Sequence, residues 1–198
     1  RRSMAMNADY HLVINSDVTF ARGTISAIET FMNGRPDVGQ LQPRMVFPDG
    51  REQLSVRLLP TPLDVFGRRF IPGFPNSQRN ARYTLASMHR DRAANVPYHQ
   101  GSFLFLRNDT LRHTGLFDER FFMYPEDIDL TRRIHAVANT LYWPGVTVVH
   151  AHRAASYRSM RMAWIHAVNM VRYFNKWGWF RDRERRVVNA ATIRAVEG

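Results

Sequence analysis

The sequence predicts an α/β fold in which a mixed sheet is flanked by helices. Short runs of apolar and β-branched residues alternate with segments of helical periodicity, and this alternation is typical of α/β proteins. Polar clusters directly follow several of the predicted strands, which is where such sheets usually build sites. With 198 residues, of which 44% are hydrophobic, the chain is long enough for one folded core.

The elements of the first half follow from this pattern. Residues 1–7 resemble the end of a helix, and residues 10–15 (YHLVIN) are an apolar, branched run that predicts a short buried strand. A helix is expected from Thr24 to Met32, closed by Asn33-Gly34. A strand over residues 38–45 then leads to a turn at residues 48–50 (PDG).

Residues 51–98 have a poor pattern, because prolines recur and arginines are dense. We expect long loops with short helices there, and loops of this length inside a compact domain are usually functional or disordered.

Regular structure is predicted again from Gly101 onward. The expected elements are a strand at 102–106, a short helix at 108–113 stopped by Gly115, a compact turn at 117–122, a helix from Pro125 to about Val137, strands at 141–143 and 146–149 around Pro144-Gly145, and a long helix at 157–177. We divide the chain into a catalytic part, residues 1–156, and a C-terminal amphipathic helical extension, residues 157–198.

Composition limits the classes of partner. The formal charge is +11, which favours anionic partners such as nucleotides, nucleic acid or anionic lipid, although a GC-rich genome would also enrich arginine. The chain has no cysteine, so it has no disulfide framework and no thiolate metal site. No apolar run reaches the ~20 residues that a membrane span needs. These features favour a cytoplasmic protein.

Two polar clusters could carry chemistry, and each has an ordinary structural alternative. Asn15-Ser16-Asp17 follows the first strand; a carboxylate there can hold Mg²⁺ or Mn²⁺, but the same residues favour a plain turn. Glu126, Asp127 and Asp129 follow Pro125, as expected at a helix start, and Arg133 is at salt-bridge spacing from Asp129. Three acids so close also raise one another's pKa, so one could serve as a base.

A third cluster, His150-Ala151-His152, follows the strand at 146–149. If that strand continues, both imidazoles lie on the same side, as metal ligands would. A structural or solvent-facing histidine is the alternative.

These clusters, in this order, resemble glycosyltransferase family 2. Residues 10–18 (YHLVINSDV) look like the family's strand ending in a D-x-D-type site, and residues 101–107 (GSFLFLR) look like its acceptor-side strand. Residues 115–130 (GLFDERFFMYPEDIDL) closely resemble its G-x-F-D-E-x-F-F-x-x-x-E-D-x-D-L block. Residues 173–179 (YFNKWGW) are similar to bacterial rhamnosyltransferase-like members.

The resemblance implies a GT-A type, Rossmann-like fold and an inverting, metal-dependent hexosyltransferase. The donor would be a nucleoside-diphosphate sugar, with rhamnose implied by the subfamily. The acceptor would be a saccharide or lipid-linked saccharide in cell-surface polysaccharide synthesis. The strands that hold the nucleotide base in the family are absent, so we expect an N-terminally incomplete fold.

Site residues follow from the matched positions. Asp127 corresponds to the catalytic base, while Asn15 and Asp17 occupy the D-x-D positions that bind the cofactor, Mg²⁺ or Mn²⁺. His150 corresponds to a late metal ligand beside Asp17. The acceptor side would include Gly101, Ser102 and Glu126.

The long C-terminal helix carries a basic stripe formed by Arg158, Arg161, Asn169, Arg172 and Lys176. It predicts either a core-packing helix with a solvated basic face or peripheral contact with an anionic membrane at the inner face of the cell. A non-catalytic basic module that binds anionic lipid or nucleic acid remains the alternative function. No nucleic-acid module signature is present, so specific nucleic-acid binding is not expected.

Overall fold

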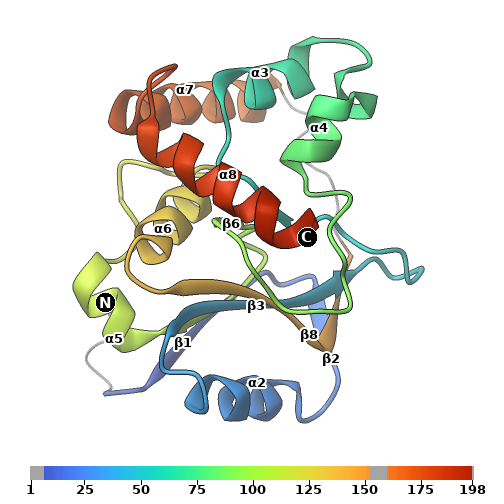
Figure 1. Ribbon diagram of the computed structural model, residues 1–198, viewed down its shortest axis with the longest axis vertical. Coiled ribbons are helices and arrows are strands. Elements are labelled where there is room, and N and C mark those ends of the chain that lie inside the picture. The colour runs from blue at the N-terminus through green and yellow to red at the C-terminus, as the bar shows by residue number, and fades with distance from the viewer. Residues whose placement is uncertain (1–6, 152–159, 198) are drawn as a thin grey trace.

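The computed structural model describes residues 7–151 and 160–197 and confirms the predicted α/β fold, with a mixed sheet between layers of helices (Figure 1). The strands are β1 (Tyr10–Ile14), β2 (Val18–Phe20), β3 (Val38–Val46), β4 (Val56–Arg57), β5 (Ala94–Asn95), β6 (Tyr98–His99), β7 (Phe103–Arg107) and β8 (Asn139–His150). The helices are α2 (Thr24–Asn33), α3 (Pro62–Phe70), the 3₁₀ turn η1 (Phe74–Asn76), α4 (Gln78–Tyr83), α5 (Asn108–Thr114), α6 (Glu126–His135), α7 (Met160–Trp177) and α8 (Arg183–Glu197).

The main sheet has the strand order β1-β7-β3-β8-β2, and β5 pairs with Leu141 and Tyr142 near the start of β8. β3 and β8 run parallel, whereas β1–β7, β3–β7, β2–β8 and β5–β8 are antiparallel. A separate two-stranded sheet pairs β4 with β6. The arrangement is consistent with a GT-A-like α/β fold.

Helices cover both faces of the main sheet, with α2 below it and α6 and the C-terminal helices above it in Figure 1. Strand β7 shows how the sequence fits these layers, because successive side chains of a strand point to opposite faces. Phe103 and Phe105 pack in the cluster that contains Ile28 and Met32 of α2, while Leu104 and Leu106 pack with α5 and α6. A run of four apolar residues is therefore buried on both sides.

The first strand differs from its prediction in burial. β1 forms where the sequence predicts a strand, but its side chains are only partly buried and Ile14 is exposed. The reason is position, since β1 lies at the edge of the sheet and pairs on one side only, with β7.

The two strands predicted around Pro144-Gly145 are one strand, β8. Its register against β3 moves from Pro43↔Trp143 to Arg44↔Thr147, so residues 144–146 bulge out. Proline has no N–H to donate to the ladder, and a side chain at Gly145 would clash with the Trp143 indole. The Pro-Gly pair marks a bulge, not the end of a strand.

Residues 51–98 contain the expected loops and short helices, but they also build core. Val56, Tyr83 and Val96 are buried in one cluster with Val196 of α8, the second helix of the predicted C-terminal helical extension. The Asn189 side chain exchanges two 2.9 Å hydrogen bonds with the backbone of Leu59.

The basic stripe of α7 is exposed at Arg161 and Arg172 but packed against other elements at Asn169 and Lys176. Asn169 is buried and donates to the Met123 carbonyl, and Lys176 bonds to the carboxylates of Asp118 and Asp129. Arg172 donates to the Arg120 carbonyl, and both Arg172 and Arg161 are exposed. Arg158 and the predicted helix start at 157 lie outside the described residues, as do residues 1–6 and His152. No described helix is long and apolar enough to cross a membrane.

Candidate active site

Two of the predicted clusters meet at one edge of the main sheet. β1 ends at Ile14, and the next residue, Asn15, donates its backbone N–H to the Ser102 carbonyl at 3.0 Å. The last residue of β8, His150, pairs with Val18 of β2, and Ala151 donates its N–H to the Asp17 carbonyl. Three strand ends therefore place Asp17 beside His150.

The side chains of Asp17 and His150 face each other, with 3.4 Å between Asp17 Oδ1 and His150 Nε2. Gln53 orients the imidazole. Its amide Nε2 donates to the His150 carbonyl at 2.6 Å, so its Oε1, 3.0 Å from His150 Nδ1, is an acceptor. Nδ1 therefore carries the proton, and in the neutral ring Nε2 presents its lone pair toward the carboxylate.

This pair fits a divalent cation. A carboxylate oxygen and an imidazole nitrogen 3.4 Å apart can both bind one divalent cation, and metal-binding histidines commonly donate their other ring N–H to an acceptor such as Gln53. The described residues contain no group of three or more His, Cys, Asp or Glu side chains that could hold a metal. Mg²⁺ and Mn²⁺ usually complete their coordination with substrate phosphates and water.

Asp127 lies at the start of α6, beside the loop that follows β6. Its side chain is 7% exposed, and its two oxygens accept N–H groups from Gly101 (2.8 Å) and Ile128 (2.7 Å). Gly101 favours this approach, because a Cβ there would lie 3.2 Å from the Cβ of Asp127, a tighter contact than most side chains make. Since Ser102 bonds to Asn15, adjacent residues connect Asp127 to the Asp17–His150 edge.

The surroundings of Asp127 raise its pKa well above the usual value. Burial is the largest cause, and the negative charge of Glu126 adds to it. The N–H groups of Gly101 and Ile128 and the charge of Arg57 oppose the rise. A carboxyl group of raised pKa is a stronger base once ionised, which is the property that general-base catalysis requires.

Two neighbours of Asp127 have polar atoms free to meet a ligand. Glu126 Oε2 and the Tyr124 hydroxyl are buried and have no hydrogen-bond partner among the described residues. Burial raises the pKa of Glu126. Tyr124 also has a positive φ of 85°, a conformation that costs energy in a non-glycine residue and is found at functional sites.

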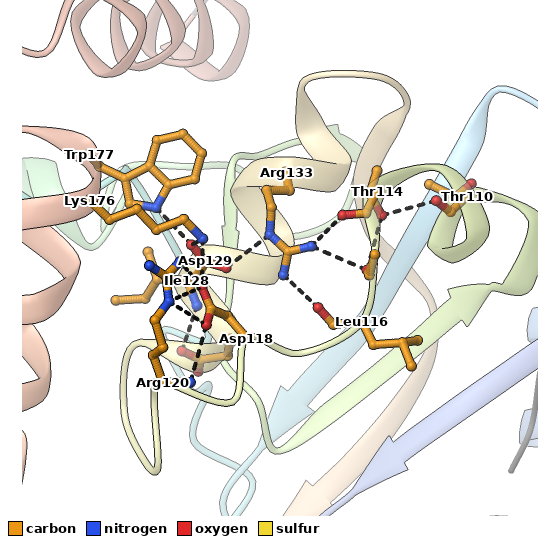
Figure 2. Close-up of polar contacts among 12 residues, drawn as sticks. Thr110, Thr114, Leu116, Asp118, Arg120, Ile128, Asp129, Arg133, Lys176 and Trp177 are labelled. Atoms are coloured by element: carbon orange, nitrogen blue, oxygen red, sulfur yellow. Dashed lines mark hydrogen bonds and ion pairs between the residues drawn. The ribbon is translucent and has the colours of Figure 1, made fainter. Parts of the chain in front are cut away.

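Asp129, the third acid, is a structural hub (Figure 2). Its side chain is fully buried and accepts from Arg133 Nε (2.9 Å), Lys176 Nζ (2.6 Å) and Trp177 Nε1 (2.8 Å). The predicted Asp129–Arg133 salt bridge is confirmed. The helix-dipole role predicted for Asp129 understates its contacts, because it also joins α6 to α7.

Ser102 contributes to the region through its backbone. Its side chain is buried, and its hydroxyl lies 3.6 Å from Met45 Sδ in the core. Its carbonyl accepts the Asn15 N–H.

Sequence reasoning missed Gln53, Arg57 and Tyr98. Gln53 orients His150 from 97 residues away, and Arg57 pairs in β4–β6 with Tyr98, which is electrostatically coupled to Asp127. All three lie in the segment of poor pattern, where no local signal marks them.

No protein-family model matches the chain. It is similar to curated proteins named N-acetylglucosaminyl-diphospho-decaprenol L-rhamnosyltransferase from two strains of Mycobacterium tuberculosis, CDC 1551 / Oshkosh and ATCC 25618 / H37Rv. Each is 34% identical over 151 residues, which are 75% of this chain and 48% of the relative. The chain thus spans about half the length of the curated relatives that it matches.

Proposed function

We propose that this chain is the catalytic part of an inverting glycosyltransferase that uses a nucleoside-diphosphate sugar as donor. The observation that carries the proposal is the joining of a buried, raised-pKa carboxyl group, Asp127, to the Asp17–His150 pair through the adjacent residues Gly101 and Ser102. The similarity to rhamnosyltransferases and the resemblance of residues 115–130 to family 2 support the same reaction.

In this reaction, Asp127 removes the proton from an acceptor hydroxyl while that oxygen attacks the anomeric carbon from the side opposite the leaving diphosphate. A single displacement inverts the anomeric configuration. Gly101 and Ile128 hold both carboxylate oxygens, so the base stays oriented. Glu126 and Tyr124 supply unpaired polar atoms for acceptor hydroxyl groups.

Asp17 and His150 would hold Mg²⁺ or Mn²⁺, with Gln53 orienting the imidazole and Asn15 at the adjoining strand end. Such an ion supplies Lewis-acid stabilisation of the departing diphosphate.

The name of the relatives supports a finer assignment, rhamnose as the donor sugar and an N-acetylglucosaminyl diphospholipid as the acceptor. An enzyme with this acceptor works at a membrane surface, in cell-surface polysaccharide synthesis. The 71% exposed Trp164 on α7 is available for peripheral contact with that surface.

The test uses the full-length protein with nucleoside-diphosphate rhamnose, other nucleotide sugars, and a lipid-linked N-acetylglucosaminyl diphosphate. We expect Asp127→Asn to lower transfer by roughly 10²–10⁴-fold, because asparagine cannot take the proton. Asp17→Ala and His150→Ala should instead weaken Mn²⁺-dependent binding of the nucleoside diphosphate, measured by calorimetry.

Asp91→Asn makes the same chemical change at an exposed position and should leave transfer unchanged. Near-normal turnover by folded Asp127→Asn would rule out the mechanism. Unchanged nucleotide binding in both alanine variants would show that the metal site is misplaced.

A further inference from the structure

Arg57, in β4, lies between two aromatic rings beside the candidate base. Its guanidinium carbon is 5.9 Å from the ring centroid of Tyr83 and 5.8 Å from that of Tyr98. Its Nε is 3.4 Å from the Leu54 carbonyl, a long hydrogen bond. Aromatic faces hold a guanidinium by cation–π attraction and fix its plane without neutralising its charge.

Arg68, in α3, lies near one of the same rings. Its guanidinium carbon is 5.8 Å from the ring centroid of Tyr83, so two cations lie close to this ring. The acid nearest on α3, Asp64, is already occupied. Its Oδ1 accepts from Arg79 Nε, and its Oδ2 accepts from the backbone and hydroxyl of Thr61 as the cap of α3.

Neither Arg57 nor Arg68 forms an ion pair with any carboxylate in the part of the chain that the structure describes. Other arginines of the same region do, as Arg44 with Glu52 and Arg79 with Asp64. Two like charges around a largely buried aromatic ring repel each other. An anion between them would remove that repulsion and gain hydrogen bonds from both guanidinium forks.

The cluster lies on the acceptor side of the site. Arg57 is paired across β4–β6 with Tyr98, three residues before Gly101, whose N–H holds Asp127. The positive charge of Arg57 acts on Asp127 and, although burial dominates, lowers the pKa of that carboxyl. The Asp17–His150 pair lies on the other side of the Gly101-Ser102 link.

We propose that Arg57 and Arg68 form an anion site for the diphosphate group of a lipid-linked acceptor. The proposal rests on the proposed function, because a sugar whose hydroxyl meets Asp127 brings its own diphosphate to this side. Phe70 and Ile71, which follow Arg68 closely in the chain, are 65% and 47% exposed and offer apolar surface where a lipid chain would leave the site.

The same chemistry could come from the donor, so the experiment separates the two sources. Binding to the full-length protein is measured with a polyisoprenyl diphosphate in detergent micelles, with the matching polyisoprenol, and with a nucleoside diphosphate plus Mn²⁺. The variants are Arg57→Gln, Arg68→Gln and Arg57→Lys. Arg82→Gln, an exposed arginine of the neighbouring α4, is the control for lost charge.

We expect Arg57→Gln and Arg68→Gln each to weaken polyisoprenyl diphosphate binding by about 10-fold or more. Arg57→Lys should lose less, and Arg82→Gln should bind as the unmodified protein does. Polyisoprenol and nucleoside diphosphate binding should not change. The Arg68→Gln variant keeps the test informative if Arg57→Gln melts at a lower temperature.

Weakened nucleoside diphosphate binding with intact polyisoprenyl diphosphate binding would assign the cluster to the donor and overturn the proposal. Unchanged binding of both diphosphates in both glutamine variants would also overturn it. Because binding is measured without sugar transfer, these results stand even if the protein transfers no sugar.

Discussion

At the scale of single residues, Glu126, Asp127 and Asp129 show how neighbouring acids acquire different properties from their surroundings. Asp129 accepts hydrogen bonds from two cations and an indole, whereas Asp127 accepts only backbone N–H groups and Glu126 leaves one oxygen unpaired. A buried carboxylate with charged partners holds structure together. One without them is disfavoured as an ion and is available for proton transfer.

The Asp129 hub leads to a prediction about stability. Asp129→Asn should lower the free energy of unfolding by about 3–5 kcal/mol, because Arg133 would be left partly buried without its counter-charge and Lys176 would keep only Asp118 of its two carboxylate partners. Urea unfolding followed by circular dichroism measures the loss. Glu126→Gln is the matched control, since Glu126 has no ion pair among the described residues. A loss below 1 kcal/mol for Asp129→Asn would contradict the hub.

The raised pKa of Asp127 leads to a prediction about pH. Only the ionised carboxylate can accept a proton, so transfer should increase as the pH rises through the raised pKa, well above the range of an ordinary aspartate. Stability should change in the opposite direction. Between the unfolded and folded pKa values the folded state binds more protons, so stability falls as pH rises, by at most about 1.4 kcal/mol per pH unit.

Comparing the unmodified protein with Asp127→Asn over pH 4 to 8 tests both parts, by initial rates and by urea unfolding. As pH rises, the unmodified protein should lose stability relative to Asp127→Asn. A difference that is flat across this range would show that the carboxyl is not shifted.

At the scale of elements, the local sequence pattern predicted a helix or strand correctly where that pattern alone determines the element. Strand β7 can be predicted from its four consecutive apolar residues. Helices α5 and α6 can be predicted from the residues at their ends and from their charges. Asp127 was found because it lies within such a block. The pattern did not reveal that β1 is an edge strand or that β8 continues through Pro144-Gly145, since pairing partners decide both.

The positions of elements held by distant contacts could not be predicted. The position of α8 depends on Asn189 bonding to Leu59, 130 residues earlier, and on Asp182 forming a buried ion pair with Arg132 at 2.8 Å. For the same reason, the sequence alone did not place Gln53 and Arg57 in the candidate site. These residues become meaningful only when long-range folding brings them to His150 and Asp127.

At the scale of the whole molecule, much of the arginine is structural, so the charge of +11 is not simply a measure of anion binding. Arg107 donates to the carbonyls of Val38, Met32 and Arg35, and Arg133 donates to those of Thr114 and Leu116. A planar fork with five donors can satisfy several carbonyl groups at once, which lysine cannot do.

Buried histidines predict that the whole molecule loses stability in mild acid. Burial lowers the pKa of His99 to about 3 and that of His166 to about 4, and it lowers the pKa of His135 as well. Each is protonated in the unfolded chain below about 6.5 but stays neutral in the folded protein. The unfolded state then binds more protons, so stability is complete above pH 6.5 and is lost as the pH falls toward 4.

His99 allows a direct test, because its ring is fully buried and contributes at most about 1.4 kcal/mol per pH unit in this window. Free energies of unfolding at pH 7.5, 6 and 5, at constant ionic strength, should decrease for the unmodified protein and decrease less steeply for His99→Gln, which cannot be protonated. His89→Gln, at an exposed position, should keep the original slope. Carboxylates with lowered pKa values add their losses only below about pH 4, and Asp127 acts in the opposite direction. Equal slopes for the unmodified protein and His99→Gln would therefore show that His99 is not held neutral by burial.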